Sequence, residues 1–139
     1  MKSVYIASSW KNRHAVEMLS AILRSYPEIE VKSFVENCFN EMYDGKPFDF
    51  ETWVHTPDAL KSFTYDIHNA MGADLVIYIG PSGPDAWAEI GAAYGNGVVI
   101  VGLHAKGETI GLMRKMIPHW FSDHKSMLKF IEDNFFTRP

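Results

Sequence analysis

Two acidic residues stand one helical turn apart in the segment that follows a glycine-rich turn. Asp85 and Glu89 occupy positions i and i+4 of a helix predicted over residues 85–96, so their carboxylates fall on one helix face. The residues around Glu89 are mostly alanine and glycine, which leaves its carboxylate room to meet a substrate. Small residues also let a helix pack closely on a sheet, with Glu89 as a solvated surface acid. Spacing alone leaves both interpretations open.

A second acid has an unfavourable position on the preceding predicted helix. Asp66 stands near the C-terminal end of the helix that begins at Thr56, and the negative end of a helix dipole disfavours an anion there. Asp66 is therefore either a functional acid or an exposed side chain with a favourable Lys or Arg neighbour. The pattern does not choose between the two.

The sequence lacks the common cofactor and metal motifs. No GxGxxG and no GxxxxGK[ST] follows the first predicted strand, which disfavours a dinucleotide redox domain and a P-loop NTPase. The six histidines form no i,i+4 pair on a predicted helix, and the single Cys38 excludes a Cys-cluster zinc site and an intramolecular disulfide. We therefore expect no metal and no cofactor. Cys38 receives no catalytic role, because no motif places a base beside it.

A strand–helix–strand unit surrounds the first acidic pair. Residues 73–79 form an apolar, β-branched run that ends in the turn Gly80–Gly83, and residues 98–101 form a second such run after the helix. A unit of this length predicts two parallel strands joined by the helix.

The rest of the chain follows the same alternation. We predict further strands at residues 4–7, 29–34 and 118–121, and further helices at residues 13–26, 56–71 and 123–135. The order predicts one α/β domain over residues 1–139, a doubly wound, flavodoxin/Rossmann-like parallel sheet of about five strands with helices on both faces. Ligands of such folds bind at the carboxyl ends of the strands. These ends carry Ser8–Trp10, Gly80–Gly83 and Gly102–His104.

Two segments carry apolar side chains whose role depends on the fold. In the helix from Thr56, one face holds Leu60, Phe63, Ile67 and Met71. Residues 36–55 form a polar and aromatic connection that is longer than most connections in a compact domain, which predicts either a functional loop or a disordered one. As a functional loop, it would form a lid from its aromatic residues Tyr43, Phe48 and Trp53.

Composition excludes several kinds of partner. The net charge is −4 for 139 residues, so a broad nucleic-acid or anionic-membrane surface is not expected. No apolar run reaches the roughly 18 residues that span a membrane. The N-terminus also lacks the apolar core of a secretory signal. These observations predict a soluble, cytoplasmic protein.

Three segments of the chain resemble one enzyme family. Residues 4–10, residues 74–94 and residues 126–135 are similar to the first strand, the glutamate-centred helix with its preceding strand, and the last helix of the nucleoside 2-deoxyribosyltransferase family. That family belongs to a superfamily of nucleoside and nucleotide N-glycosidases. The resemblance implies an enzyme that cleaves the N-glycosidic bond of a nucleoside through a carboxylate and transfers the sugar to another base.

The resemblance also implies roles for individual residues. Glu89 matches the nucleophile that attacks the anomeric carbon, and Asp66 matches the acid that protonates or holds the leaving base. Tyr5 matches a tyrosine that orients the nucleophile, and Trp10 matches an aromatic residue near the base. The usual Ser-Gly-Thr-Ala turn before the nucleophile helix is Ser-Gly-Pro-Asp-Ala here, at residues 82–86, which alters the expected contacts to the sugar hydroxyls.

Substrate contacts are expected at two strand ends, from Ser8, Ser9, Trp10, Ser82, Gly83 and Asp85. The nucleotide hydrolases of the superfamily hold a phosphate with serines and basic groups, a role that the three serines could fill with Lys11 or Arg13. Asp85 would repel a phosphate at the same turn, which favours a neutral nucleoside. Ser82 is equally suited to cap the N-terminus of the following helix.

Other functions remain compatible with these residues. The site could instead hydrolyse the N-glycosidic bond of a nucleoside 5′-monophosphate, or cleave NAD, although the net charge disfavours a pocket for a diphosphate. A non-catalytic module of the same fold would bind or sense a nucleotide without needing Glu89. The resemblance further implies a homo-oligomer, either a dimer or a larger assembly. Its interface, or alternatively the packing of the last helix, could use the apolar residues Met113, Met116, Ile117, Trp120 and Phe121.

Overall fold

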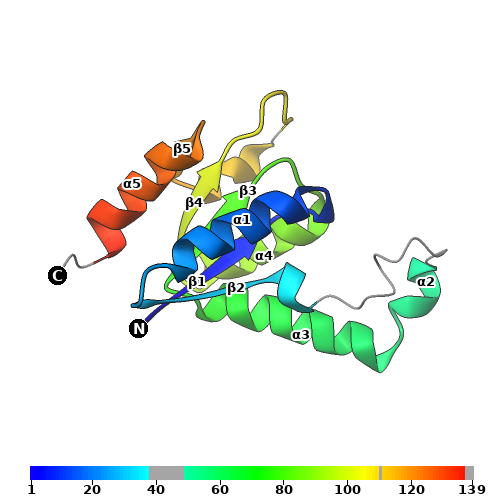
Figure 1. Cartoon of the computed structure of the whole chain (residues 1–139). Helices are drawn as coiled ribbons and strands as arrows, with labels where there is room; N and C mark the ends of the chain where they lie inside the picture. The colour runs from blue at the N-terminus through cyan, green and yellow to red at the C-terminus, as the bar shows by residue number, and fades with distance from the viewer. Residues whose placement is uncertain (38–48, 110, 137–139) are drawn as a thin grey trace.

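The computed structural model describes residues 1–37, 49–109 and 111–136, so the predicted lid residues Tyr43 and Phe48 lie outside the described residues, as does Cys38. Helices and strands alternate along the chain (Figure 1). The strands are β1 (Lys2–Ala7), β2 (Ile29–Ser33), β3 (Leu75–Ile79), β4 (Val99–Leu103) and β5 (His119–Phe121). The helices are α1 (Arg13–Arg24), α2 (Phe50–Trp53), α3 (Pro57–Gly72), α4 (Pro84–Gly95) and α5 (His124–Phe135), with short 3-10 turns η1 (Trp10–Asn12), η2 (Phe34–Asn37) and η4 (Leu112–Met116).

The strands form one parallel sheet in the order β2-β1-β3-β4-β5. This order confirms the predicted flavodoxin-like, doubly wound sheet of five strands. The direction of winding reverses between β1 and β3, where Val4 pairs with Leu75. Folds of this kind bind their ligands beside the carboxyl ends of the strands that flank such a point.

Successive side chains of each strand enter two separate cores. Val4 and Ile6 of β1 pack on one face of the sheet with residues of α1 and α5. Tyr5 and Ala7 pack on the opposite face with residues of α3 and α4. This is the period of two expected for a strand that is covered on both sides. The alternation places Tyr5 on the same side of the sheet as the two helices that carry the predicted acids.

Helix α3 reaches beyond the edge of the sheet (Figure 1). Thr56 begins the helix as predicted, since its hydroxyl accepts a hydrogen bond from the Ala59 amide at 3.2 Å. In the first half of the helix, Leu60 and Phe63 remain 65% and 62% exposed. Their face therefore does not pack on the sheet, because this half of α3 extends beyond the edge of the sheet.

The apolar group near β5 is divided between the two cores. Ile117 is buried on the α3–α4 side, with Met116 and Trp120 packed beside it. Phe121 belongs to the opposite face, where its ring contacts Phe130 of α5 at 5.4 Å between centroids. Of this group, only Phe121 packs against the last helix, as one of the two interpretations expected of all five residues. Homo-oligomerisation stays a prediction.

Within the described ranges, no helix is long and apolar enough to cross a membrane.

Glycine at position 102 is required by close packing in the centre of β4. A Cβ atom there would lie 2.7 Å from Cε3 of Trp120 and 3.1 Å from Cγ2 of Ile117. We expect Gly102→Ala to lower the free energy of unfolding by about 1–3 kcal/mol, because the partly buried indole of Trp120 and the Ile117 side chain must move. Gly91→Ala is the matched control, since a Cβ at this position of α4 meets nothing within 4 Å. It should stabilise the helix by about 0.5–1 kcal/mol. Urea unfolding of both variants measures this, and equal stabilities would contradict it.

Candidate active site

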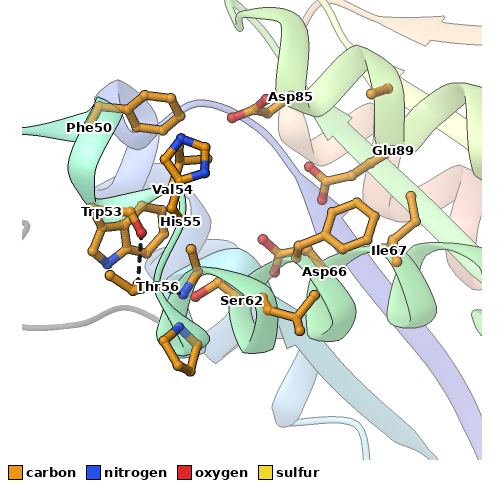
Figure 2. A pocket seen from close by; sticks show the side chains of 15 residues that line it. Phe50, Trp53, Val54, His55, Thr56, Ser62, Asp66, Ile67, Asp85 and Glu89 are labelled. Atoms are coloured by element: carbon orange, nitrogen blue, oxygen red, sulfur yellow. Dashed lines mark hydrogen bonds between the residues drawn. The ribbon is translucent and has the colours of Figure 1, made fainter.

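A pocket of about 690 Å³ opens between α2, the part of α3 from Pro57 to Ile67 and the start of α4 (Figure 2). One side carries the carboxylates of Asp66, Asp85 and Glu89, and the opposite side carries residues of α2 and of the turn after it. The complete lining is Phe50, Trp53, Val54, His55, Thr56, Pro57, Ala59, Leu60, Ser62, Phe63, Asp66, Ile67, Asp85, Ala88 and Glu89.

The packing of two helices on one sheet face brings the acids together. Gly83 caps helix α4, which begins at Pro84 and presents Asp85 and then Glu89 one turn deeper. Helix α3 lies beside it on the same face of the sheet, and Asp66 points from α3 toward Glu89 (Figure 2). The predicted pairing of Asp85 with Glu89 on one face is therefore present, and Asp66 joins them.

Tyr5 contacts the Glu89 carboxylate from strand β1 of the sheet. Its side chain is fully buried in β1, and its hydroxyl donates a hydrogen bond to Oε1 of Glu89. Burial, together with the nearby charges of Glu89 and Asp66, raises the pKa of Tyr5 far above its usual value. The hydroxyl therefore keeps its proton and acts as a fixed donor. Tyr5, Asp66 and Glu89, which the resemblance assigned to catalysis, thus lie together in the structure.

Burial perturbs both acids of this group. Glu89 is only 7% exposed, and desolvation raises its pKa to about 8. Desolvation likewise raises the pKa of Asp66 to about 7. The hydrogen bond from Tyr5 acts in the opposite direction on both groups, and the charge of Asp85 adds to the increase. Near neutral pH the pair therefore holds a proton that it can exchange, as acid–base catalysis requires.

One oxygen of Asp66 lacks a partner inside the protein. Its Oδ1 atom is buried and has no hydrogen bond to any described residue. A buried acceptor without a donor costs about 1–3 kcal/mol. Because Asp66 lines the pocket, a polar group of a bound molecule can supply the missing hydrogen bond.

The remaining predicted contact residues, apart from Asp85, do not line this pocket. Ser8 donates to the Ile79 carbonyl at 2.6 Å and accepts from Asn12 at 2.9 Å, which ties β1 to β3. Ser9 caps η1 through the Lys11 amide at 3.2 Å. Contacts of these two serines with a substrate stay predictions.

Trp10 and the turn before α4 have contacts of their own. The Trp10 indole meets Phe34 edge-on at 4.8 Å between centroids, on the α1–α5 side of the sheet, opposite the pocket. Ser82 shares a hydrogen bond of 2.8 Å with the Tyr78 hydroxyl and is not the helix cap, because Gly83 occupies that position. Substrate contacts of Trp10, Ser82 and Gly83 also stay predictions.

The opposite wall of the pocket is the part that the sequence analysis missed. Phe50 and His55 were not identified, although Trp53 beside them was expected in a lid. The exposed face of α3, with Leu60 and Phe63, forms part of the same wall. The available signal was the combination of an apolar helix face with an aromatic segment directly before the Thr56 cap.

The pocket carries acidic rather than basic charge. Among the described residues that line it, there is no Lys or Arg. Across the described parts of the chain, no cluster of three or more His, Cys, Asp or Glu side chains has the arrangement needed to hold a metal ion.

Comparisons with known proteins show what the fold is similar to. No protein-family model and no curated protein sequence matches the chain. A 2-deoxyribosyltransferase from Bacillus psychrosaccharolyticus has a similar structure, with a TM-score of 0.67 and 23% sequence identity over 90% of this chain and 89% of that one. A conserved protein from Enterococcus faecalis V583 has a TM-score of 0.68 and 17% identity, covering 97% of this chain and 99% of that one. The chain therefore has the nucleoside deoxyribosyltransferase-like fold that the sequence resemblance implied.

Proposed function

We propose that the protein cleaves the N-glycosidic bond of a nucleoside through Glu89 and transfers the sugar to another base. The observation that carries the proposal is the buried Glu89 carboxylate, which accepts a hydrogen bond from Tyr5 and lines a pocket together with Asp66. Placing a buried carboxylate in a pocket costs stability, so the arrangement is typical of a functional site. The structural likeness to a 2-deoxyribosyltransferase supports the same chemistry.

In the first step, a Glu89 oxygen attacks the anomeric carbon of the sugar. A carbon–oxygen bond forms, the bond from that carbon to the base nitrogen breaks, and its electron pair goes to the base. Asp66 gives its proton to the departing base, so no free anion is released into a pocket that is already acidic. The fixed donor Tyr5 favours the ionised form of Glu89, and because the two acids share a proton near neutral pH, the reactive form is the one in which Asp66 holds it.

In the second step, the reaction runs in reverse with a new acceptor. A second base attacks the anomeric carbon, its N–H proton passes to Asp66, and the ester bond to Glu89 breaks. The products are a new nucleoside and the original protonation states of both acids. If water takes the place of the second base, the same residues hydrolyse the nucleoside.

The substrate is proposed to be uncharged at its 5′ position. The described lining supplies three carboxylates and no Lys or Arg, so a phosphate would meet repulsion. Hydrolysis of a nucleoside 5′-monophosphate would require basic groups that the described lining does not provide.

A substrate panel tests the proposal. Purified protein is incubated with deoxynucleosides, ribonucleosides and their 5′-monophosphates, with and without a free acceptor base, and the products are separated by chromatography. We expect release of free base from a nucleoside and a new nucleoside when the acceptor is present. Base release that does not depend on the acceptor base would make the protein a hydrolase. The absence of any turnover, with thermal stabilisation by one of the compounds, would indicate a binding module instead.

The role of Tyr5 predicts a shift in the pH dependence of this activity. Glu89 must be ionised to attack, so activity is lost as the pH falls through its pKa. The Tyr5 hydrogen bond lowers that pKa, and Tyr5→Phe removes it. The acidic limb of the kcat/KM profile should therefore move to higher pH, by about one unit.

Tyr78→Phe is the matched control for this shift. It removes another hydroxyl from the same sheet face, but Tyr78 hydrogen-bonds to Ser82 and Glu108 rather than to Glu89. An unchanged acidic limb in Tyr5→Phe, or an equal shift in Tyr78→Phe, would contradict the role assigned to Tyr5.

A further inference from the structure

The pocket has two chemically different ends. The carboxylates of Asp66, Asp85 and Glu89 occupy one end, on the facing parts of α3 and α4. Along α3 toward α2, the lining changes from Asp66 to Phe63 and then to Leu60, a distance of about 9 Å at 1.5 Å per residue. At that far end the wall is completed by residues of α2 and is largely apolar. A ligand that fills the pocket must therefore be polar at one end and flat or apolar at the other.

His55 is the polar group best placed at the apolar end. It follows α2, and its imidazole points into the pocket and faces the carboxylates across it (Figure 2). Within the described part of the chain, this ring has no hydrogen-bond or ion-pair partner. Thr56 beside it is already engaged, since its hydroxyl donates to the Trp53 carbonyl at 2.7 Å and accepts from the Ala59 amide at 3.2 Å.

Phe50 supplies an open aromatic face next to this imidazole. Its side chain is 51% exposed and lines the pocket, and its ring lies 6.2 Å from that of Trp53 between centroids. An exposed ring on a pocket wall is suited to stack against a planar heterocycle, because every nucleobase has a flat π-face.

We propose that Phe50 and His55 form the subsite for the heterocyclic base, with Phe50 stacked on the ring and His55 hydrogen-bonded to a ring nitrogen or an exocyclic oxygen. The proposal rests on the proposed function for the position of the sugar, which must lie at Glu89. The base then extends past Asp66, which is placed to protonate it, toward α2. An imidazole can donate or accept a hydrogen bond, so His55 suits the mixed donors and acceptors of a nucleobase edge.

Binding of free nucleobases tests the subsite without requiring turnover. Adenine, hypoxanthine and cytosine are titrated at millimolar concentrations into the wild-type protein by calorimetry. We expect at least one base to bind, with affinity reduced about tenfold in His55→Ala and about fivefold or more in Phe50→Ala. His55→Gln, which keeps a hydrogen-bonding group, should recover part of the loss.

Two controls guard against a general loss of structure. His14→Ala removes a histidine from the exposed surface of α1, outside the pocket lining, and should leave base affinity unchanged. Imidazole ¹H–¹⁵N spectra of the wild type should show one histidine whose resonances move on adding base, and that signal should be missing in His55→Gln.

The outcomes separate this subsite from the proposed reaction. Base binding that depends on His55 and Phe50 supports the subsite even if no nucleoside is cleaved, a result that would remove only the glycosyl chemistry. Nucleoside cleavage with an unchanged KM in His55→Ala would overturn the subsite and leave the reaction intact. The subsite is also overturned if no free base binds the wild type, or if the bases bind folded His55→Ala as tightly as the wild type.

Discussion

Replacing Glu89 by alanine is expected to abolish base release from every nucleoside that the wild-type protein cleaves. The substitution removes the atom proposed to form the bond to the sugar, and losses of roughly 10⁴-fold or more follow the removal of a nucleophile. Chromatographic assays of the wild type and the variant under identical conditions measure the ratio. Retention of more than a few per cent of the wild-type rate would assign the chemistry to another group.

Two companion experiments sharpen this result. Formate or azide is small enough to enter the space left in Glu89→Ala and should restore part of the base release by attacking the sugar itself. Asp85→Asn changes a carboxyl group of the same pocket that is exposed and less deeply placed on α4. We expect it to reduce the rate far less, because Asp85 acts on the other two acids only through its charge.

Glu89→Gln should make the folded protein more stable than the wild type at pH 8. At pH 5 this difference in stability should be much smaller. In the folded state the pKa of Glu89 is raised to about 8, whereas an unfolded chain titrates near the usual glutamate value. Between these values the folded state holds more protons than the unfolded state, so wild-type stability falls as the pH rises. The amide has no proton to lose, and the difference at pH 8 should be on the order of a few kcal/mol.

Urea unfolding at pH 5, 6.5 and 8 measures this difference. Asp66→Asn should also become more stable relative to the wild type as the pH rises. This difference should reach its full size at a lower pH than for Glu89→Gln, because the pKa of Asp66 is raised only to about 7. Glu28→Gln changes an exposed carboxyl group outside the pocket and should follow the wild type at every pH. Parallel curves for Glu89→Gln and the wild type would show that the buried carboxylate carries no such penalty. The predicted gain in stability with loss of activity is the usual trade-off at a functional site.

Local patterns were sufficient to predict the fold. The apolar run of residues 73–79, the helix over residues 85–96 and the run of residues 98–101 became β3, α4 and β4 with boundaries shifted by one or two residues. Such agreement arises because a strand buried on both faces and a helix packed on one side each leave a distinct hydrophobic period. Helix α1 ends at Arg24 rather than at residue 26, since the chain turns before Pro27.

The site was predictable only in part, for a physical reason. Asp85 and Glu89 were visible through their spacing, but Tyr5 sits in a buried strand where an aromatic residue looks like core, and only the family resemblance singled it out. The wall formed by α2 had no periodic pattern to reveal it. The apolar face of α3 was visible, yet hydrophobic spacing does not tell whether a face meets a sheet or a pocket.

The carboxylates of the pocket and its opposite wall, which includes Phe50 and His55, lie in parts of the fold that differ in how deeply they are buried. Glu89 is anchored to β1 through Tyr5, so changes near it disturb a fully buried strand. Helix α2 has no buried residue, and Phe50 and His55 are exposed. Substitutions on α2 therefore have little effect on folding. If the proposed base subsite is correct, selection, natural or in the laboratory, can change the preferred base through substitutions at Phe50 and His55 while the carboxylates of α3 and α4 stay as they are.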